Sequence, residues 1–193
     1  MGTCKGKGIR GDAVAFLGKM KRSAIYAGTF DPITLGHLDL LHRASLVFDK
    51  VLVAVAECPR KSTMFSVKER CEMVRQASHN LENVTVKPFS GLLVHFARKK
   101  GIHVLVRGLR AYSDFEYEFQ MALTNRQLAP DLETLFLMPK ETHSYLSSSV
   151  VREVAELGGN IRGFVPACVL PYVRKYTGRG GNAAGSRGQR TRD

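Results

Sequence analysis

From Ser23 onward, short apolar runs alternate with longer amphipathic stretches along most of the chain. Short runs rich in β-branched residues are typical of buried strands, and an apolar residue at every third or fourth position is typical of a helix that covers a sheet. Strands that alternate with helices form a parallel sheet. We therefore expect an α/β fold, a doubly wound five-stranded parallel sheet in a single domain, with ligands outside the carboxyl ends of the strands.

The expected strands are Ala24 to Gly28, Lys50 to Ala56, Val84 to Phe89, Val104 to Arg107 and Glu133 to Leu137. The expected helices are Gly36 to Phe48, Ser66 to about Ser78, Leu92 to Lys100, Asp114 to Ala129 and Ser148 to Leu157, with a closing segment from Pro166 to Tyr176. Two helix ends carry their own signals. Ser66 and Glu69 have the spacing of a capping box, and Pro130 stops the helix before it.

The positive charge of the chain is concentrated at its ends. Of the formal net charge of +12 over 193 residues, residues 1–22 carry +5 and residues 177–193 carry +3, which leaves +4 for residues 23–176. Both tails are rich in glycine and small polar residues and lack apolar periodicity. We expect residues 1–22 and 177–193 to be disordered basic extensions of one domain at 23–176, and Met20 is a candidate for the true start.

Composition limits the classes of function. No apolar run approaches the roughly 20 residues that cross a bilayer, and no signal-peptide pattern is present, so we expect a cytoplasmic protein without a membrane partner. The cysteines stand singly and form no metal-ligand pattern, so no protein metal site is expected. A nucleic-acid-binding module that uses the basic tails is an alternative. The small charge of the body and its lack of an aromatic-basic pattern argue against nucleic acid as the main partner.

The segment Thr29 to His37, TFDPITLGH, leads from the first expected strand into the first expected helix. Gly36 allows close approach of the backbone to a ligand, and a first helical turn has open N–H groups and a partial positive charge suited to phosphate. The side chains of His37 and Thr29 can each donate a hydrogen bond to a phosphate. A bare Gly-His pair is more often only a helix junction, but the nine-residue context favours a phosphate site.

Other polar residues follow later elements. Arg107 and Arg110 come directly after the fourth expected strand, at the ligand-binding edge, where two guanidinium groups can grip phosphates. A run of serines, Ser147 to Ser149, stands at a helix start, where such residues can cradle phosphates but are more often only an N-cap. Lys61 in a polar loop and Glu118 on a helix would by themselves be solvated surface residues.

With these motifs the chain resembles the nucleotidylyltransferase superfamily, through its [TH]xGH signature, and within it the bacterial phosphopantetheine adenylyltransferases. The matching segments are YAGTFDPITLGH, PRKSTMF, FSGLLVHFA, VRGLRAYSDFEYEFQMALTNRQLAP, LFLMP and YLSSSVVREVA, and they span about residues 23–176. The resemblance implies a Rossmann-like nucleotidylyltransferase fold. It also implies transfer of the adenylyl group of ATP to 4'-phosphopantetheine, which yields dephospho-coenzyme A and pyrophosphate in the penultimate step of coenzyme A synthesis.

The resemblance also assigns roles to residues. The implied catalytic residues are His37, Thr29, Lys61 and Arg107; His37 would stabilise the transition state at the α-phosphate, and Thr29 would help to place the acceptor phosphate. The implied acceptor-binding residues are Thr29, Lys61, Leu93 and Arg107. The implied ATP-binding residues are Gly28, Thr29, Phe30, His37, Gly108, Arg110, Glu118, Tyr145, Leu146, Ser147, Ser148, Ser149, Val150 and Val151.

Cofactor and assembly are implied in the same way. The resemblance implies Mg²⁺ bound through the ATP phosphates, in-line attack without a covalent intermediate, and a homohexamer. A sibling transferase that acts on nicotinamide mononucleotide, or with CTP on a glycerol phosphate, is the alternative among enzymes. Those families share the Gly-His turn but not the RGLR and DFEYE segments.

Overall fold

A five-stranded parallel sheet forms the centre of the computed structural model, which describes residues 22–57, 62–109 and 112–181. The strands are β1 (Ser23–Gly28), β2 (Lys50–Ala56), β3 (Val84–Phe89), β4 (Val104–Gly108) and β5 (Glu133–Leu137), in the spatial order β3-β2-β1-β4-β5. β1 is central, and the chain builds one half of the sheet beside it before it crosses to the other side for β4. The expected doubly wound five-stranded sheet is confirmed.

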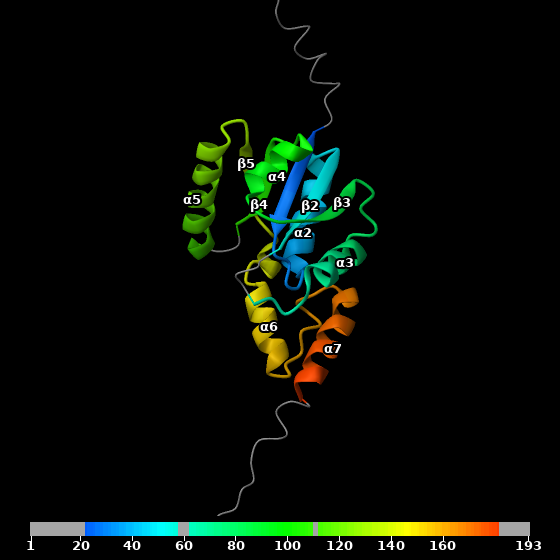
Figure 1. Cartoon of the computed structure of the whole chain (residues 1–193). Coiled ribbons are helices and arrows are strands. Elements are labelled where there is room, and N and C mark those ends of the chain that lie inside the picture. The colour runs from blue at the N-terminus through cyan, green and yellow to red at the C-terminus, as the bar shows by residue number, and fades with distance from the viewer. Residues whose placement is uncertain (1–21, 58–61, 110–111, 182–193) are drawn as a thin grey trace, which may run out of the picture.

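Helices alternate with the strands as the pattern predicted, and the last two lie together beyond one end of the sheet (Figure 1). They are α2 (Leu35–Val47), α3 (Val67–Ala77), α4 (Leu93–Lys100), α5 (Tyr112–Leu128), α6 (Ser148–Glu156) and α7 (Leu170–Gly181), with short 3-10 turns η1 (Glu141–His143) and η2 (Ala167–Val169). The capping box at α3 is confirmed, because Ser66 and Glu69 each accept the other's backbone N–H. Within the described ranges, no helix combines the length and apolar character needed to cross a membrane.

The core lies on both faces of the sheet. Along β1, Ala24 and Tyr26 belong to one buried cluster and Ile25 and Ala27 to the other, as the two-residue period of a strand requires. The first cluster packs under α2, α3, α6 and α7, and the second under α4. Cys71 lies in the first cluster as a free thiol, and burial raises its pKa.

The folded domain extends beyond both expected boundaries. The backbone N–H of Arg22 donates to the carboxylate of Asp49 at 2.8 Å, so Arg22 pairs with the body rather than with a tail. α7 continues through Gly181, five residues past Tyr176. The helical hydrogen bonds persist where apolar periodicity has ended, which is why the sequence pattern placed the end too early. Met20 and most of both tails lie outside the described residues.

Candidate active site

A cavity of about 310 Å³ lies where β1 and β4 end and where α6 begins. This is the point at which the sheet changes direction, and open α/β sheets bind ligands there. The predicted site residues that line it are Gly28, Thr29, Phe30, His37, Arg107, Gly108, Glu118, Ser147, Ser148 and Ser149. The fold therefore brings together three segments that are far apart in the sequence.

Not every predicted site residue lines this cavity. Lys61 and Arg110 lie outside the described residues. Leu146 and Val151 are buried in the core, and Tyr145 is exposed and packs edge-on against a neighbouring ring. None of these side chains lines the cavity, and neither does that of Val150, which is exposed.

His37 is held in one orientation by the start of α2. Its Nδ1 lies 3.1 Å from the backbone nitrogen of Thr34 and 2.8 Å from the Thr34 hydroxyl, in a capping box that the two residues share. Because a backbone N–H can only donate, Nδ1 accepts, and in the neutral ring Nε2 carries the proton. Phe30 packs edge-on against the imidazole, with 5.2 Å between ring centroids. His37 is thus both a cap and a cavity residue with Nε2–H as a donor.

The backbone at the start of α2 has a different role from the one predicted. The N–H of Leu35 donates to the carbonyl of Phe164 at 2.9 Å, and the N–H of His37 is used by the capping box. Gly36 is buried and does not line the cavity; a Cβ there would lie 3.1 Å from the carbonyl oxygen of His143. The expected approach of the Gly36 backbone to a ligand stays a prediction. Gly36 is needed for close packing against η1.

Arg107 and Glu118 form one rigid unit in the cavity wall. The guanidinium donates to both carboxylate oxygens at 2.7 Å and 2.5 Å, and its third nitrogen donates to the carbonyl of Ala27 at 2.6 Å. Burial alone would lower the pKa of Arg107, but the hydrogen bonds and charge of Glu118 outweigh it and raise the pKa above its ordinary value. Arg107 is therefore a fixed, permanently charged group, and Glu118 orients it.

The first two serines at the start of α6 make different hydrogen bonds. The hydroxyl of Ser147 accepts the N–H of Val150 at 3.1 Å as the N-cap and keeps its own hydrogen for a ligand. The hydroxyl of Ser148 donates to the carbonyl of Pro32 at 2.8 Å and so ties α6 to the turn after β1. The capping predicted for this run is confirmed, and all three serines also line the cavity, where their contact with phosphate stays a prediction.

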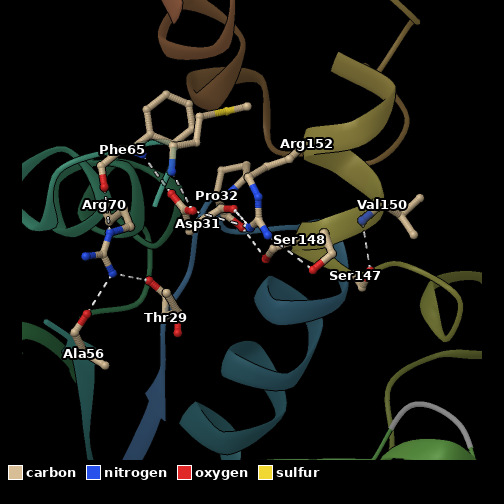
Figure 2. Close-up of polar contacts among 12 residues, drawn as sticks. Thr29, Asp31, Pro32, Ala56, Phe65, Arg70, Ser147, Ser148, Val150 and Arg152 are labelled. Carbon is tan, nitrogen blue, oxygen red and sulfur yellow. Dashed lines mark hydrogen bonds and ion pairs between the residues drawn. The ribbon is translucent and has the colours of Figure 1, made fainter. Parts of the chain in front are cut away.

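A buried aspartate links the turn after β1 to the loop before α3 and to helix α6, and it was not assigned a role from the sequence (Figure 2). Asp31, which is 2% exposed, accepts the backbone N–H groups of Met64 and Phe65, each at 2.9 Å. The guanidinium of Arg152 donates to the Asp31 carbonyl at 2.6 Å and to the hydroxyl of Ser149 at 3.3 Å. Arg152 also lines the cavity. The only sequence signal for it is a basic residue three positions after Ser149, on the same helix face.

A second unassigned residue, Arg70, joins the ends of the two central strands. It is 2% exposed and donates to the carbonyls of Thr29 at 2.7 Å, Ala56 at 2.8 Å and Phe65 at 3.1 Å (Figure 2). Buried backbone carbonyls need such partners. Arg70 therefore fixes the backbone of Thr29 from behind the cavity.

A second cavity of about 250 Å³ adjoins the first, because Arg107 and Glu118 line both. Leu93, the remaining acceptor-site prediction, lies here rather than in the first cavity. Its other walls include Phe89 and Met121, so this cavity is more apolar in character than the first. Together, the two cavities offer a polar part lined by charged side chains, joined to an apolar part.

The chain is similar to known proteins over most of its length. Residues 25–154 match the family described as cytidylyltransferase-like. A phosphopantetheine adenylyltransferase from Moorella thermoacetica (strain ATCC 39073 / JCM 9320) is 57% identical over 155 residues, which cover 80% of this chain and 97% of the relative. One from Xylella fastidiosa (strain M23) is 54% identical and covers 80% of this chain and 96% of the relative.

A solved structure has the same fold at lower sequence identity. A crystal structure assigned to a nicotinate-nucleotide adenylyltransferase from Vibrio parahaemolyticus superposes with a TM-score of 0.61 and covers 82% of this chain and 96% of its own. Its identity to this chain is 20%, so it establishes the fold alone.

Proposed function

The chain belongs to the phosphopantetheine adenylyltransferases, which contain the cytidylyltransferase-like domain, and from this membership we propose that it transfers the adenylyl group of ATP to 4'-phosphopantetheine. The products are dephospho-coenzyme A and pyrophosphate. The observation that carries the proposal is a single cavity lined by Thr29, His37 and Arg107 and by the serines at the start of α6. A cytoplasmic location for the reaction stays a prediction.

The reaction is an in-line displacement at phosphorus. An oxygen of the acceptor phosphate attacks the α-phosphorus of ATP, a new P–O bond forms, and the bond to pyrophosphate breaks. The Nε2–H of His37 donates to an α-phosphate oxygen as charge builds up there, and the hydroxyl of Thr29 donates to the incoming phosphate. Arg107 supplies fixed positive charge. The enzyme works by alignment and charge stabilisation, and no side chain becomes a covalent intermediate.

The second cavity supports the choice of acceptor. A 4'-phosphopantetheine molecule has a phosphate at one end of a long, flexible arm. With its phosphate at Arg107, the arm can enter the adjoining cavity beside Leu93 and Met121. Glycerol phosphate, in contrast, has no arm that could fill such an extension.

A Mg²⁺ ion is proposed to enter with ATP, bound through phosphate oxygens. Among the described lining residues, the two carboxylates each face an arginine, Asp31 facing Arg152 and Glu118 facing Arg107, which favours this mode over a site made of protein ligands. The ion would neutralise part of the triphosphate charge before an anionic acceptor approaches.

The activity is tested by measuring pyrophosphate release with each nucleotide and acceptor. We expect release with ATP and 4'-phosphopantetheine, and little with CTP, nicotinamide mononucleotide or glycerol phosphate. Excess chelator should abolish release, and added Mg²⁺ should restore it. Release that requires CTP, or that is fastest with nicotinamide mononucleotide, would contradict the proposed acceptor.

Self-association is proposed through α5. Phe115, Phe119 and Leu123 recur every four residues on this helix and are about half exposed, and the first two stack at 5.6 Å between ring centroids. Figure 1 shows α5 at the β5 side of the molecule. An apolar stripe of this kind is typical of a surface that another subunit covers. The homohexamer implied by the resemblance would provide such a subunit.

Light scattering coupled to size-exclusion chromatography tests this assembly. The full chain should elute as a hexamer, and Phe119→Glu should shift it to smaller species, because a charge would be buried in the interface. Leu46→Glu is the matched control, since Leu46 is an exposed apolar residue on α2. Equal effects of the two substitutions, or a wild-type monomer, would contradict the role of α5.

A further inference from the structure

Arg70, a residue of α3, bridges the place where β1 and β2 part (Figure 2). The two strands are paired as far as Gly28 and Val55. Beyond that pair, the carbonyls of Thr29 and Ala56 accept hydrogen bonds from one nitrogen of the guanidinium, Nη1, at 2.7 Å and 2.8 Å. The position of Thr29 relative to the end of β2 therefore depends on the Arg70 side chain.

The third hydrogen bond of Arg70 holds the loop before α3. Its Nε donates to the carbonyl of Phe65 at 3.1 Å, and the N–H of Phe65 donates to the carboxylate of Asp31 at 2.9 Å. The peptide groups on both sides of Phe65 are therefore fixed. Thr63, two residues earlier, lines the same cavity as Thr29. One guanidinium thus sets the separation of two walls of that cavity.

The positive charge of Arg70 is not paired with a carboxylate in the described part of the chain. The side chain is 2% exposed, and its hydrogen bonds there all go to backbone carbonyls. Arg107, in contrast, has an ion pair with Glu118. Because a buried charge is screened much less than an exposed one, Arg70 leaves a positive potential behind Thr29, and this potential favours a bound anion.

The contacts of Arg70 are confined to the ends of β1 and β2 and to the loop before α3. Among the described residues, the serines at the start of α6 line the cavity but form no hydrogen bond with Arg70. In the proposed reaction, the hydroxyl of Thr29 donates to the incoming acceptor phosphate. A change at Arg70 should therefore affect the acceptor more than ATP.

We propose that Arg70 is a positioning residue for the acceptor phosphate. It holds Thr29 and the loop before α3 at the separation at which this phosphate binds between them, and it adds positive charge from behind the cavity. Arg70 acts through the backbone of these segments and does not itself touch the substrate. This inference rests on the proposed adenylyl transfer.

Calorimetric titration of the full chain with 4'-phosphopantetheine and, separately, with ATP tests the proposal. Arg70→Met removes the charge and all donors, and it should weaken acceptor binding on the order of 10- to 100-fold while changing ATP binding by less than about threefold. Arg70→Lys keeps the charge and three N–H donors, so it should restore part of the acceptor affinity. In turnover assays, KM for 4'-phosphopantetheine should rise more than KM for ATP.

Two control variants on α3 separate this role from support of the fold. Arg75→Met removes an arginine of the same helix that is half exposed and pairs with Glu72, and it should leave both affinities unchanged. Ser66→Ala removes the N-cap of α3, so it should lower thermal stability without changing acceptor affinity.

Three results with folded Arg70 variants would overturn the inference: acceptor binding like that of the wild type, an equal loss of acceptor and ATP affinity, or a loss of acceptor affinity that Ser66→Ala reproduces. Failure of both Arg70 variants to fold would also overturn it, because Arg70 would then support the fold alone. A wild-type chain that does not adenylylate 4'-phosphopantetheine would instead overturn the proposed function.

Discussion

Substitution of His37 by alanine is expected to lower kcat by about 100-fold or more, by analogy with donors that stabilise charge in a transition state. The ring is fixed by Thr34 and Phe30, so its Nε2–H needs no reorganisation when charge develops on the α-phosphate. The change in KM for ATP should be smaller than the change in kcat, because the bond strengthens in the transition state. Steady-state kinetics of pyrophosphate release measures both.

Two further variants separate catalysis by His37 from its capping role. The side-chain oxygen of asparagine can take the place of Nδ1, so His37→Asn should keep the cap and the thermal stability of the wild type but lose turnover as alanine does. Thr34→Ala should cost about 1 kcal/mol of stability through the lost cap and reduce turnover far less. A folded His37→Ala enzyme with near-normal turnover would refute the assignment.

Arg107→Met is expected to weaken the binding of both anionic substrates, the acceptor phosphate that it holds and the nearby ATP, by more than 10-fold each, and to destabilise the fold by about 2 kcal/mol. It removes a positive charge from the cavity and leaves the carboxylate of Glu118 there unpaired. The two side chains are 27% and 13% exposed, so the loss of stability should stay below the roughly 3–5 kcal/mol of a fully buried pair. Nucleotide titration and thermal unfolding measure the two effects.

The double variant Arg107→Met/Glu118→Gln identifies the cause of the defect. With both charges removed, stability and ATP binding should recover in part relative to Arg107→Met, because no unpaired carboxylate remains to repel the triphosphate. Turnover should stay low, since the positive charge at the reacting phosphates is still absent. Equal ATP affinity in the single and double variants would show that the carboxylate is not the cause.

The sequence predicted the architecture well because apolar periodicity is a local signal. β2 and β3 have the expected bounds, since continuous apolar or alternating runs with turn residues on both sides mark where a strand lies. α7 was less predictable. Its last turns hold no apolar stripe, so nothing in the pattern distinguishes a helix that continues from a tail that begins.

The supports of the site could not be predicted in the same way. The bonds of Asp31 to Met64, of Arg70 to Thr29 and of Arg152 to Asp31 join side chains to distant backbone, and such pairs leave no periodic pattern. The capping box of Thr34 and His37 was missed because histidine stands where glutamate or glutamine is usual. The resemblance identified many of the residues that line the cavity, such as His37 and Arg107, whereas only the fold reveals the residues that hold them in place.

Asp31 and Arg152, which contact each other in the folded protein, lie 121 residues apart in the chain, so the ribosome synthesises Asp31 well before Arg152. At about 5–20 residues per second, the ribosome adds Arg152 roughly 6 to 24 s after Asp31. For all of that time, the turn after β1 lacks the partner that completes the phosphate cavity. A nascent chain, or a fragment released before α6 has been synthesised, should therefore neither capture ATP nor gain stability from it, and only a chain that includes α6 competes for the nucleotide pool.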